Sequence, residues 1–79
     1  MNLTETALIE FLQEQRQITG VSRDSALFSD GTIDSLGMID LITFIEATEG
    51  VEIGLADVTL ENFDTVARIY AFVREKVAA

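Results

Sequence analysis

Apolar residues recur at helical spacing between residues 35 and 49, and this spacing restricts the fold more than any other feature of the chain. Side chains at positions i, i+3, i+4 and i+7 lie on one face of an α-helix. Four apolar residues follow that pattern here: Met38, Leu41, Ile42 and Ile45. Gly50 comes next and suits the left-handed backbone of a helix C-cap. The pattern predicts a helix from about Ser35 to Glu49 with one face in a core.

The N-terminal segment has the same kind of pattern. We expect a helix from about Leu3 to Gln15, in which Asn2 and Glu5 form a variant of the capping box. Its apolar stripe consists of Leu3, Ala7, Leu8, Phe11 and Leu12. Such a stripe is typical of a helix that lies on a core with its other face in solvent.

Two further helices are expected after residue 50. A short one lies around Leu60 to Phe63, and a last one runs from about Thr65 to Val77 with Asp64 as its N-cap. The apolar stripe of the last helix consists of Val66, Ile69, Tyr70, Val73 and Val77. Val51-Glu52-Ile53 is too short for a sheet and is expected to anchor a loop. The predicted fold class is all-α: a four-helix bundle with a long loop between helices one and two and a short third helix.

The long loop covers about residues 18 to 34. Loops of this length in a small domain are usually functional or disordered. Five apolar residues predict that this loop is ordered on the core: Ile18, Val21, Leu27, Phe28 and Ile33. The Asp30-Gly31 pair is a turn signal just before the second helix.

Length and composition exclude several classes of protein. A chain of 79 residues predicts a single domain, residues 1–79, and it contains neither cysteine nor histidine. The chain therefore has no disulfide, no thiolate metal site and no imidazole base. We expect a protein that is not an enzyme, because the usual catalytic groups are missing.

The charge is strongly negative and unevenly distributed. The net charge is -9, and ten acidic residues occur from Asp24 to Asp64 with no Lys or Arg among them. This charge disfavours binding to nucleic acids or anionic membranes and favours partners with basic patches. No basic n-region or apolar run indicates a signal or a membrane span. We expect a cytoplasmic monomer.

Asp34-Ser35-Leu36 stands where the loop meets the second helix. Ser35 has no histidine to activate it as a nucleophile and no Gly-x-Ser-x-Gly elbow around it. The preceding Asp30-Gly31 resembles part of a calcium loop, but Ala26 and Gly37 would occupy its first and last ligand positions, so no metal site is expected. A serine cap is the simplest reading. A serine that is modified fits the exposed helix start and its acidic surroundings better.

The outer face of the second helix also carries apolar residues. A purely solvated face would not need Leu36 and Ile39, which lie beside Asp40, Thr43, Glu46 and Ala47. One interpretation is that both pack under the preceding loop. The other, which we favour, is a docking surface of apolar contacts rimmed by acids.

Taken together, these segments resemble the acyl carrier protein family along essentially the whole chain. Residues 30–41, Asp-Gly-Thr-Ile-Asp-Ser-Leu-Gly-Met-Ile-Asp-Leu, resemble the family's attachment motif with its Asp-Ser-Leu core intact. Residues 51–53 resemble the segment after helix two. Residues 60–66, Leu-Glu-Asn-Phe-Asp-Thr-Val, resemble the short third helix and the start of the fourth.

The resemblance implies a discrete carrier with covalent 4'-phosphopantetheine on Ser35, whose thiol holds the cargo as a thioester. It implies as partners a phosphopantetheinyl transferase and acyl- or aminoacyl-loading and processing enzymes with basic docking patches. The implied docking residues are Asp34, Leu36, Ile39, Asp40 and Glu46. Gly37 departs from the acidic residue common in fatty-acid carriers and is similar to some peptidyl, aminoacyl and D-alanyl carriers. The cargo, fatty acyl, polyketide or aminoacyl, stays open, and the alternative is a small acidic interaction module with unmodified Ser35.

Overall fold

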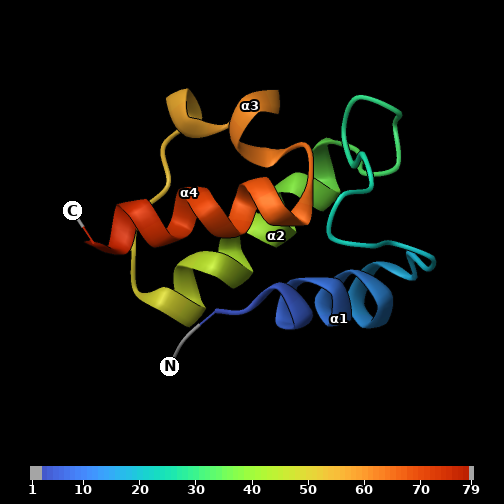
Figure 1. Cartoon of the computed structure of the whole chain (residues 1–79), viewed down its shortest axis with the longest axis horizontal. Helices are drawn as coiled ribbons and strands as arrows, with labels where there is room; N and C mark the ends of the chain where they lie inside the picture. The colour runs from blue at the N-terminus through green and yellow to red at the C-terminus, as the bar shows by residue number, and fades with distance from the viewer. Residues whose placement is uncertain (1–2, 79) are drawn as a thin grey trace.

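The computed structural model describes residues 3–78, and this part of the chain is helical with no β-strand. The main helices are α1 (Glu5–Arg16), α2 (Ser35–Glu49) and α4 (Val66–Ala78), with a 3-10 turn η1 (Leu55–Asp57) and a four-residue helix α3 (Leu60–Phe63) between α2 and α4. The predicted all-α fold with a long first loop and a short third helix is confirmed (Figure 1).

The helix ends follow local capping chemistry. The Oγ1 atom of Thr4 accepts a hydrogen bond from Ala7 N at 3.0 Å, so α1 begins at Glu5 and not at Leu3 as expected. Asn2, the expected cap, lies outside the described residues. At the other end of α2, Gly50 has φ 68°, the left-handed conformation that the sequence predicted.

The expected cap of the last helix is wrong. The Oγ1 atom of Thr65 accepts a hydrogen bond from Arg68 N at 3.0 Å, while the carboxylate of Asp64 points to the loop before α2. Both residues are good N-caps, and local sequence does not distinguish them. A contact with a distant part of the chain therefore decides the role of Asp64.

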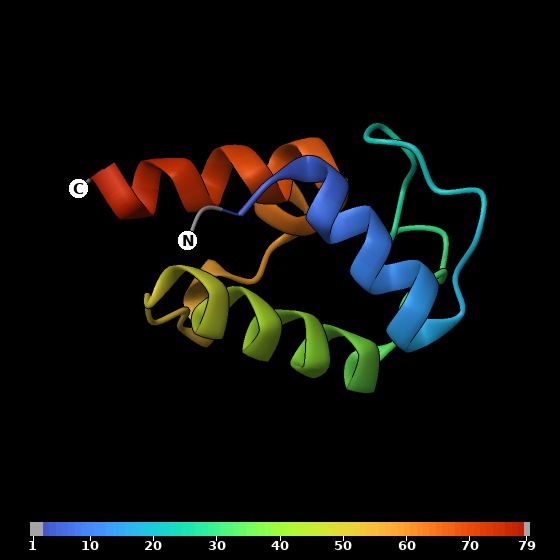
Figure 2. The same cartoon turned by 90° about the horizontal axis from the view of Figure 1, so that it is seen from below.

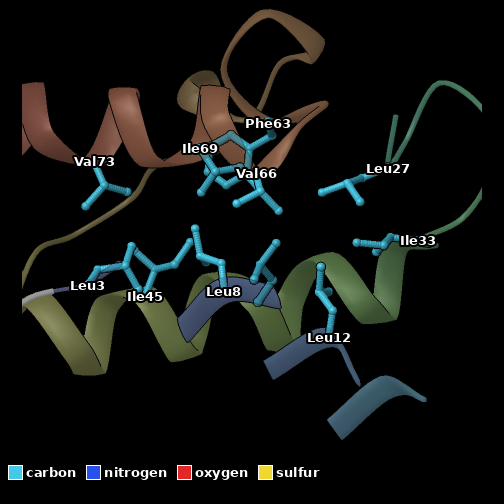
Figure 3. Close-up of a cluster of buried hydrophobic side chains, with 11 residues drawn as sticks. Leu3, Leu8, Leu12, Leu27, Ile33, Ile45, Phe63, Val66, Ile69 and Val73 are labelled. Carbon is cyan, nitrogen blue, oxygen red and sulfur yellow. The ribbon is translucent and has the colours of Figure 1, made fainter. Parts of the chain in front are cut away.

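A single cluster of buried apolar side chains joins the helices. Figure 3 shows side chains of α3 and α4 opposite those of α1 and α2, with two loop residues at one end of the cluster. The cluster consists of Leu3, Leu8, Leu12, Leu27, Ile33, Leu41, Ile45, Phe63, Val66, Ile69 and Val73. The predicted stripes supply most of it, although Met38 and Ile42 are only half-buried and Val77 is exposed.

Contacts outside this apolar cluster complete the packing of α2. The rings of Phe11 and Phe44 stack at a centroid distance of 4.5 Å and join α1 to α2. The Glu49 carboxylate at the end of α2 is almost fully buried, accepts a hydrogen bond from Leu3 N and pairs with Arg74 of α4. A buried carboxylate needs such partners. These contacts join α2 to α1 and to α4, and Figure 2 shows α1 running from beside α4 towards the first turn of α2.

Candidate functional site

Ser35 is the first residue of α2, and Asp34 takes the capping role in front of it. The Oδ1 atom of Asp34 accepts a hydrogen bond from Gly37 N at 2.9 Å, and its backbone oxygen accepts one from Met38 N. Because the side chain of Asp34 accepts the hydrogen bond from Gly37 N, Asp34 and not the serine is the N-cap. Ser35 is exposed. The reading of this serine as a simple cap is therefore wrong.

The loop before Ser35 is fixed by Asp64. Its carboxylate accepts hydrogen bonds from Phe28 N and Ser29 N at 2.9 Å each and from Ser29 Oγ at 2.8 Å. These bonds stabilise the charged form and lower the pKa of Asp64 to about 2, the backbone bond from Ser29 being the largest cause. The backbone oxygen of Asp64 also accepts a bond from Leu27 N. The junction of α3 and α4 thus holds the loop in place.

The last turn of the loop is also ordered. Gly31 has φ 79°, and the Asp30 carboxylate accepts hydrogen bonds from Thr32 N and from Thr32 Oγ1, the latter at 2.7 Å. The hydroxyl bond is the main reason that the pKa of Asp30 is lowered. Ile33, which directly follows Thr32, is buried. The predicted turn and the predicted anchoring of the loop are both confirmed.

A surface hollow of about 490 Å³ opens beside Ser35. Apart from Asp34 and Ser35 its walls are apolar, and they consist of Phe28, Ile33, Met38, Ile39 and Leu55. The loop, α2 and η1 each contribute to it. The exposed hydroxyl of Ser35 therefore has an apolar recess next to it and solvent on its other side.

The apolar side chains on the outer face of α2 are exposed. Leu36 is 68% exposed and Ile39 is 58% exposed, so the alternative that both pack under the loop is wrong. Leu55 on η1 is 91% exposed and lines the same hollow as Ile39. Sequence reasoning missed Leu55, because a lone leucine in a short turn has no periodic pattern to place it. We call Leu36, Ile39 and Leu55 the apolar surface.

The acids expected for docking have different surroundings. Asp34 directly precedes Ser35, and Asp40 lies about 7.5 Å further along the helix. The two acids share a partner, Arg16, whose Nη1 donates to Asp40 at 2.7 Å. Glu46 lies about 16 Å further along the helix than Ser35, at 1.5 Å per residue. Its carboxylate accepts a hydrogen bond from Ile53 N at 2.9 Å. The structure therefore joins Asp34 and Asp40 through Arg16 at the end of α2 that begins with Ser35, and it gives Glu46 a role in holding the loop after α2.

Gly37 is buried in the first turn of α2, against Ile33 of the preceding loop. A Cβ atom at this position would lie 2.7 Å from Cγ2 of Ile33, which is closer than real contacts allow. It would also lie 3.4 Å from Oδ1 of Asp34. An acidic residue here would have to displace Ile33, a wall of the hollow beside Ser35.

Across residues 3–78 the structure has no group of three or more acidic side chains that could hold a metal ion. Within the same residues, no helix has the length and apolar character needed to cross a membrane.

The fold and the site define a class: a small helical protein that presents an exposed serine at a helix start, beside an apolar and acidic surface. The chain is 30% identical over 77 residues to a D-alanyl carrier protein of Abiotrophia defectiva, and the alignment covers 95% of this chain and 98% of that protein. It is 28% identical over 75 residues to a D-alanyl carrier protein of Streptococcus pyogenes serotype M5 (strain Manfredo), covering 95% of each.

No protein-family model matches the chain, and no solved structure does. The near-complete alignment with curated carrier proteins agrees with the resemblance in the sequence and with the helical fold. The chain belongs to the acyl carrier protein family.

Proposed function

We propose that this chain carries an aminoacyl group, D-alanine first among candidates, as a thioester on a 4'-phosphopantetheine arm attached to Ser35. The observation that carries the proposal is the exposed Ser35 at the first position of α2, with Asp34 rather than the serine as the cap. The chain contains no cysteine, so a thioester needs a thiol from outside the polypeptide. The arm would supply that thiol.

The proposed attachment is a phosphoryl transfer to Ser35. The Oγ atom forms a bond to the phosphorus that carries pantetheine in coenzyme A, and the pyrophosphate P–O bond breaks. Adenosine 3',5'-bisphosphate leaves, and the hydroxyl proton goes to a base of the transferase. The start of a 15-residue helix favours the resulting phosphodiester, because backbone N–H groups and the positive dipole end lie there.

The apolar surface and its acids support docking on enzymes with basic patches. A partner that covers Leu36, Ile39 and Leu55 would remove their exposed apolar surface from water. The net charge of -9 attracts cationic partners and speeds their association. We expect the transferase and the loading enzyme to use this surface in turn, since Ser35 lies beside it.

The identity of the cargo rests on two observations. The relatives described above are named D-alanyl carrier proteins. Gly37 is buried against Ile33, and a Cβ atom there would lie 2.7 Å from Cγ2 of that residue, which suits the glycine of aminoacyl-type carriers. Fatty acyl and polyketide cargo are the competing assignments, and the loading test compares the amino acids with a fatty acid.

The attachment is tested by intact mass after incubation with coenzyme A and a phosphopantetheinyl transferase. We expect one phosphopantetheine adduct on the wild type and none on Ser35→Ala. Ser25→Ala is the matched control, because Asp24-Ser25 is the other Asp-Ser pair and Ser25 Oγ accepts a bond from Ser22 N inside the loop. An unmodified wild type, or an adduct on Ser35→Ala, would contradict the proposal. The first outcome would favour the unmodified interaction module.

The cargo is tested on the modified protein. D-alanine, L-alanine and a fatty acid are each supplied with ATP and a matching adenylating or ligase enzyme, and thioester formation is followed by mass and by release with hydroxylamine. Preferential loading of D-alanine is expected. Loading of the fatty acid alone would replace the aminoacyl assignment while leaving Ser35 as the attachment site.

A further inference from the structure

Arg16 lies over the first turn of α2, although it belongs to α1. It is the last residue of α1, and its Nη1 donates to Oδ2 of Asp40 at 2.7 Å while its Nη2 lies 3.8 Å from Oδ1 of Asp34. Figure 2 shows the C-terminal end of α1 close to the N-terminal end of α2. One guanidinium therefore pairs with two carboxylates at the end of α2 that begins with Ser35.

Arg16 packs beside the backbone of Gly37. A Cβ atom at residue 37 would lie 3.5 Å from Nε of Arg16, an ordinary van der Waals distance, so the arginine lies next to the first turn of α2. Arg16, Asp34 and Gly37 line the same small hollow of about 150 Å³. The left-handed backbone of Gln17, with φ 53°, ends α1 directly after Arg16. Arg16 is thus placed at this end of α2 by its position at the C-terminus of α1 and by its ion pairs with Asp34 and Asp40.

The same carboxylates belong to the proposed docking region. Both acids are among the docking residues that the resemblance implies, and both pair with Arg16, so a basic patch that docks at this end of α2 would meet both. While Arg16 occupies them, that patch meets one net negative charge instead of two. Both acids remain more than half exposed, and pairs of this kind are weak and can be exchanged for another cation.

We propose that Arg16 is a specificity-determining residue that competes with basic side chains of partner enzymes for Asp34 and Asp40. This competition weakens the contribution of charge to partner binding. Contacts with the apolar surface then make the larger contribution to binding affinity. Partners that contact Leu36, Ile39 and Leu55 well are then favoured over proteins that are merely basic. The inference rests on the proposed function of Ser35 and concerns how partners reach it.

The test compares Arg16→Gln with Arg23→Gln as substrates of a phosphopantetheinyl transferase. Arg23 pairs with Glu5 of α1 and with Asp24, away from Asp34 and Asp40. Each variant loses one positive charge, so the change in long-range steering is matched. We expect Arg16→Gln to lower KM about two- to five-fold with kcat unchanged, the range that an exposed ion pair supplies. Arg23→Gln should leave KM nearly unchanged.

A double-mutant cycle assigns the effect to the carboxylate. Asp40→Asn should raise KM because a docking carboxylate is lost, and the gain from Arg16→Gln should be smaller in the Asp40→Asn background than in the wild type. Melting curves of all variants are recorded first, and the kinetics are measured where each is folded.

Equal gains for both arginine variants, or an unchanged or higher KM for Arg16→Gln, would overturn the inference. Those results differ from failure of the proposed function, in which no variant gains an adduct.

Discussion

Two isoleucines on α2 allow one chemical change to be made once in the core and once on the apolar surface. Ile45 has no exposed surface, whereas Ile39 is 58% exposed. Replacing either residue with alanine removes the same three carbon atoms. Only at residue 45 does this leave a cavity among packed side chains. The pair therefore separates stability from recognition.

The expected magnitudes differ widely. Ile45→Ala should lower the free energy of unfolding by about 2–5 kcal/mol, as for other large-to-small changes at buried sites. A domain of 79 residues has a total free energy of unfolding of about 4–12 kcal/mol, so this loss is a large part of it. The melting temperature should fall by about 8 °C or more. Ile39→Ala should change the free energy by no more than about 0.5 kcal/mol.

The assays are urea unfolding followed by circular dichroism, and transferase kinetics on whichever variants remain folded. Ile39→Ala should raise KM, because a docking contact is lost, and Ile45→Ala should leave KM unchanged where it is folded. Similar stability losses for the two variants would refute the orientation of α2. A normal KM for Ile39→Ala would refute the role of the apolar surface.

Three further predictions concern charge. Asp64→Asn should lower the free energy of unfolding above pH 4, and the difference in this free energy from the wild type should shrink as pH falls from about 4 to 2. The reason is that the folded-state pKa of Asp64 is lowered to about 2, so the stabilising effect of the carboxylate is lost on protonation. Unfolding curves at several pH values test this, and a constant difference would contradict it. Glu46→Ala should cost about 1–3 kcal/mol in urea unfolding because Ile53 N–H loses its acceptor, while Glu46→Gln, which keeps an acceptor, should cost less. Sodium and magnesium at matched ionic strength should raise the melting temperature equally by screening the net charge of -9; a saturable response to calcium alone would instead indicate a specific site.

The helices and the presence of Ser35 at a helix start could be read from the sequence, because periodicity and capping are local. The expected bounds of α2, Ser35 to Glu49, are those of the structure, and Gly50 ends the helix as predicted. The core positions Leu41 and Ile45 follow from the same spacing. The attachment of a prosthetic group to Ser35 stays a prediction that the mass experiment tests.

The partners of the charged groups were decided only by the tertiary structure. The sequence has no base between Asp24 and Asp64, yet Arg16 reaches Asp40 across 24 residues and Lys76 reaches Asp57 across 19. Asp64 binds Phe28 N across 36 residues instead of capping its own helix. A local pattern carries no information on such distances, because they depend on how the helices pack. For the same reason, only the packing of η1 against α2 shows that Leu55 and Ser35 line the same hollow.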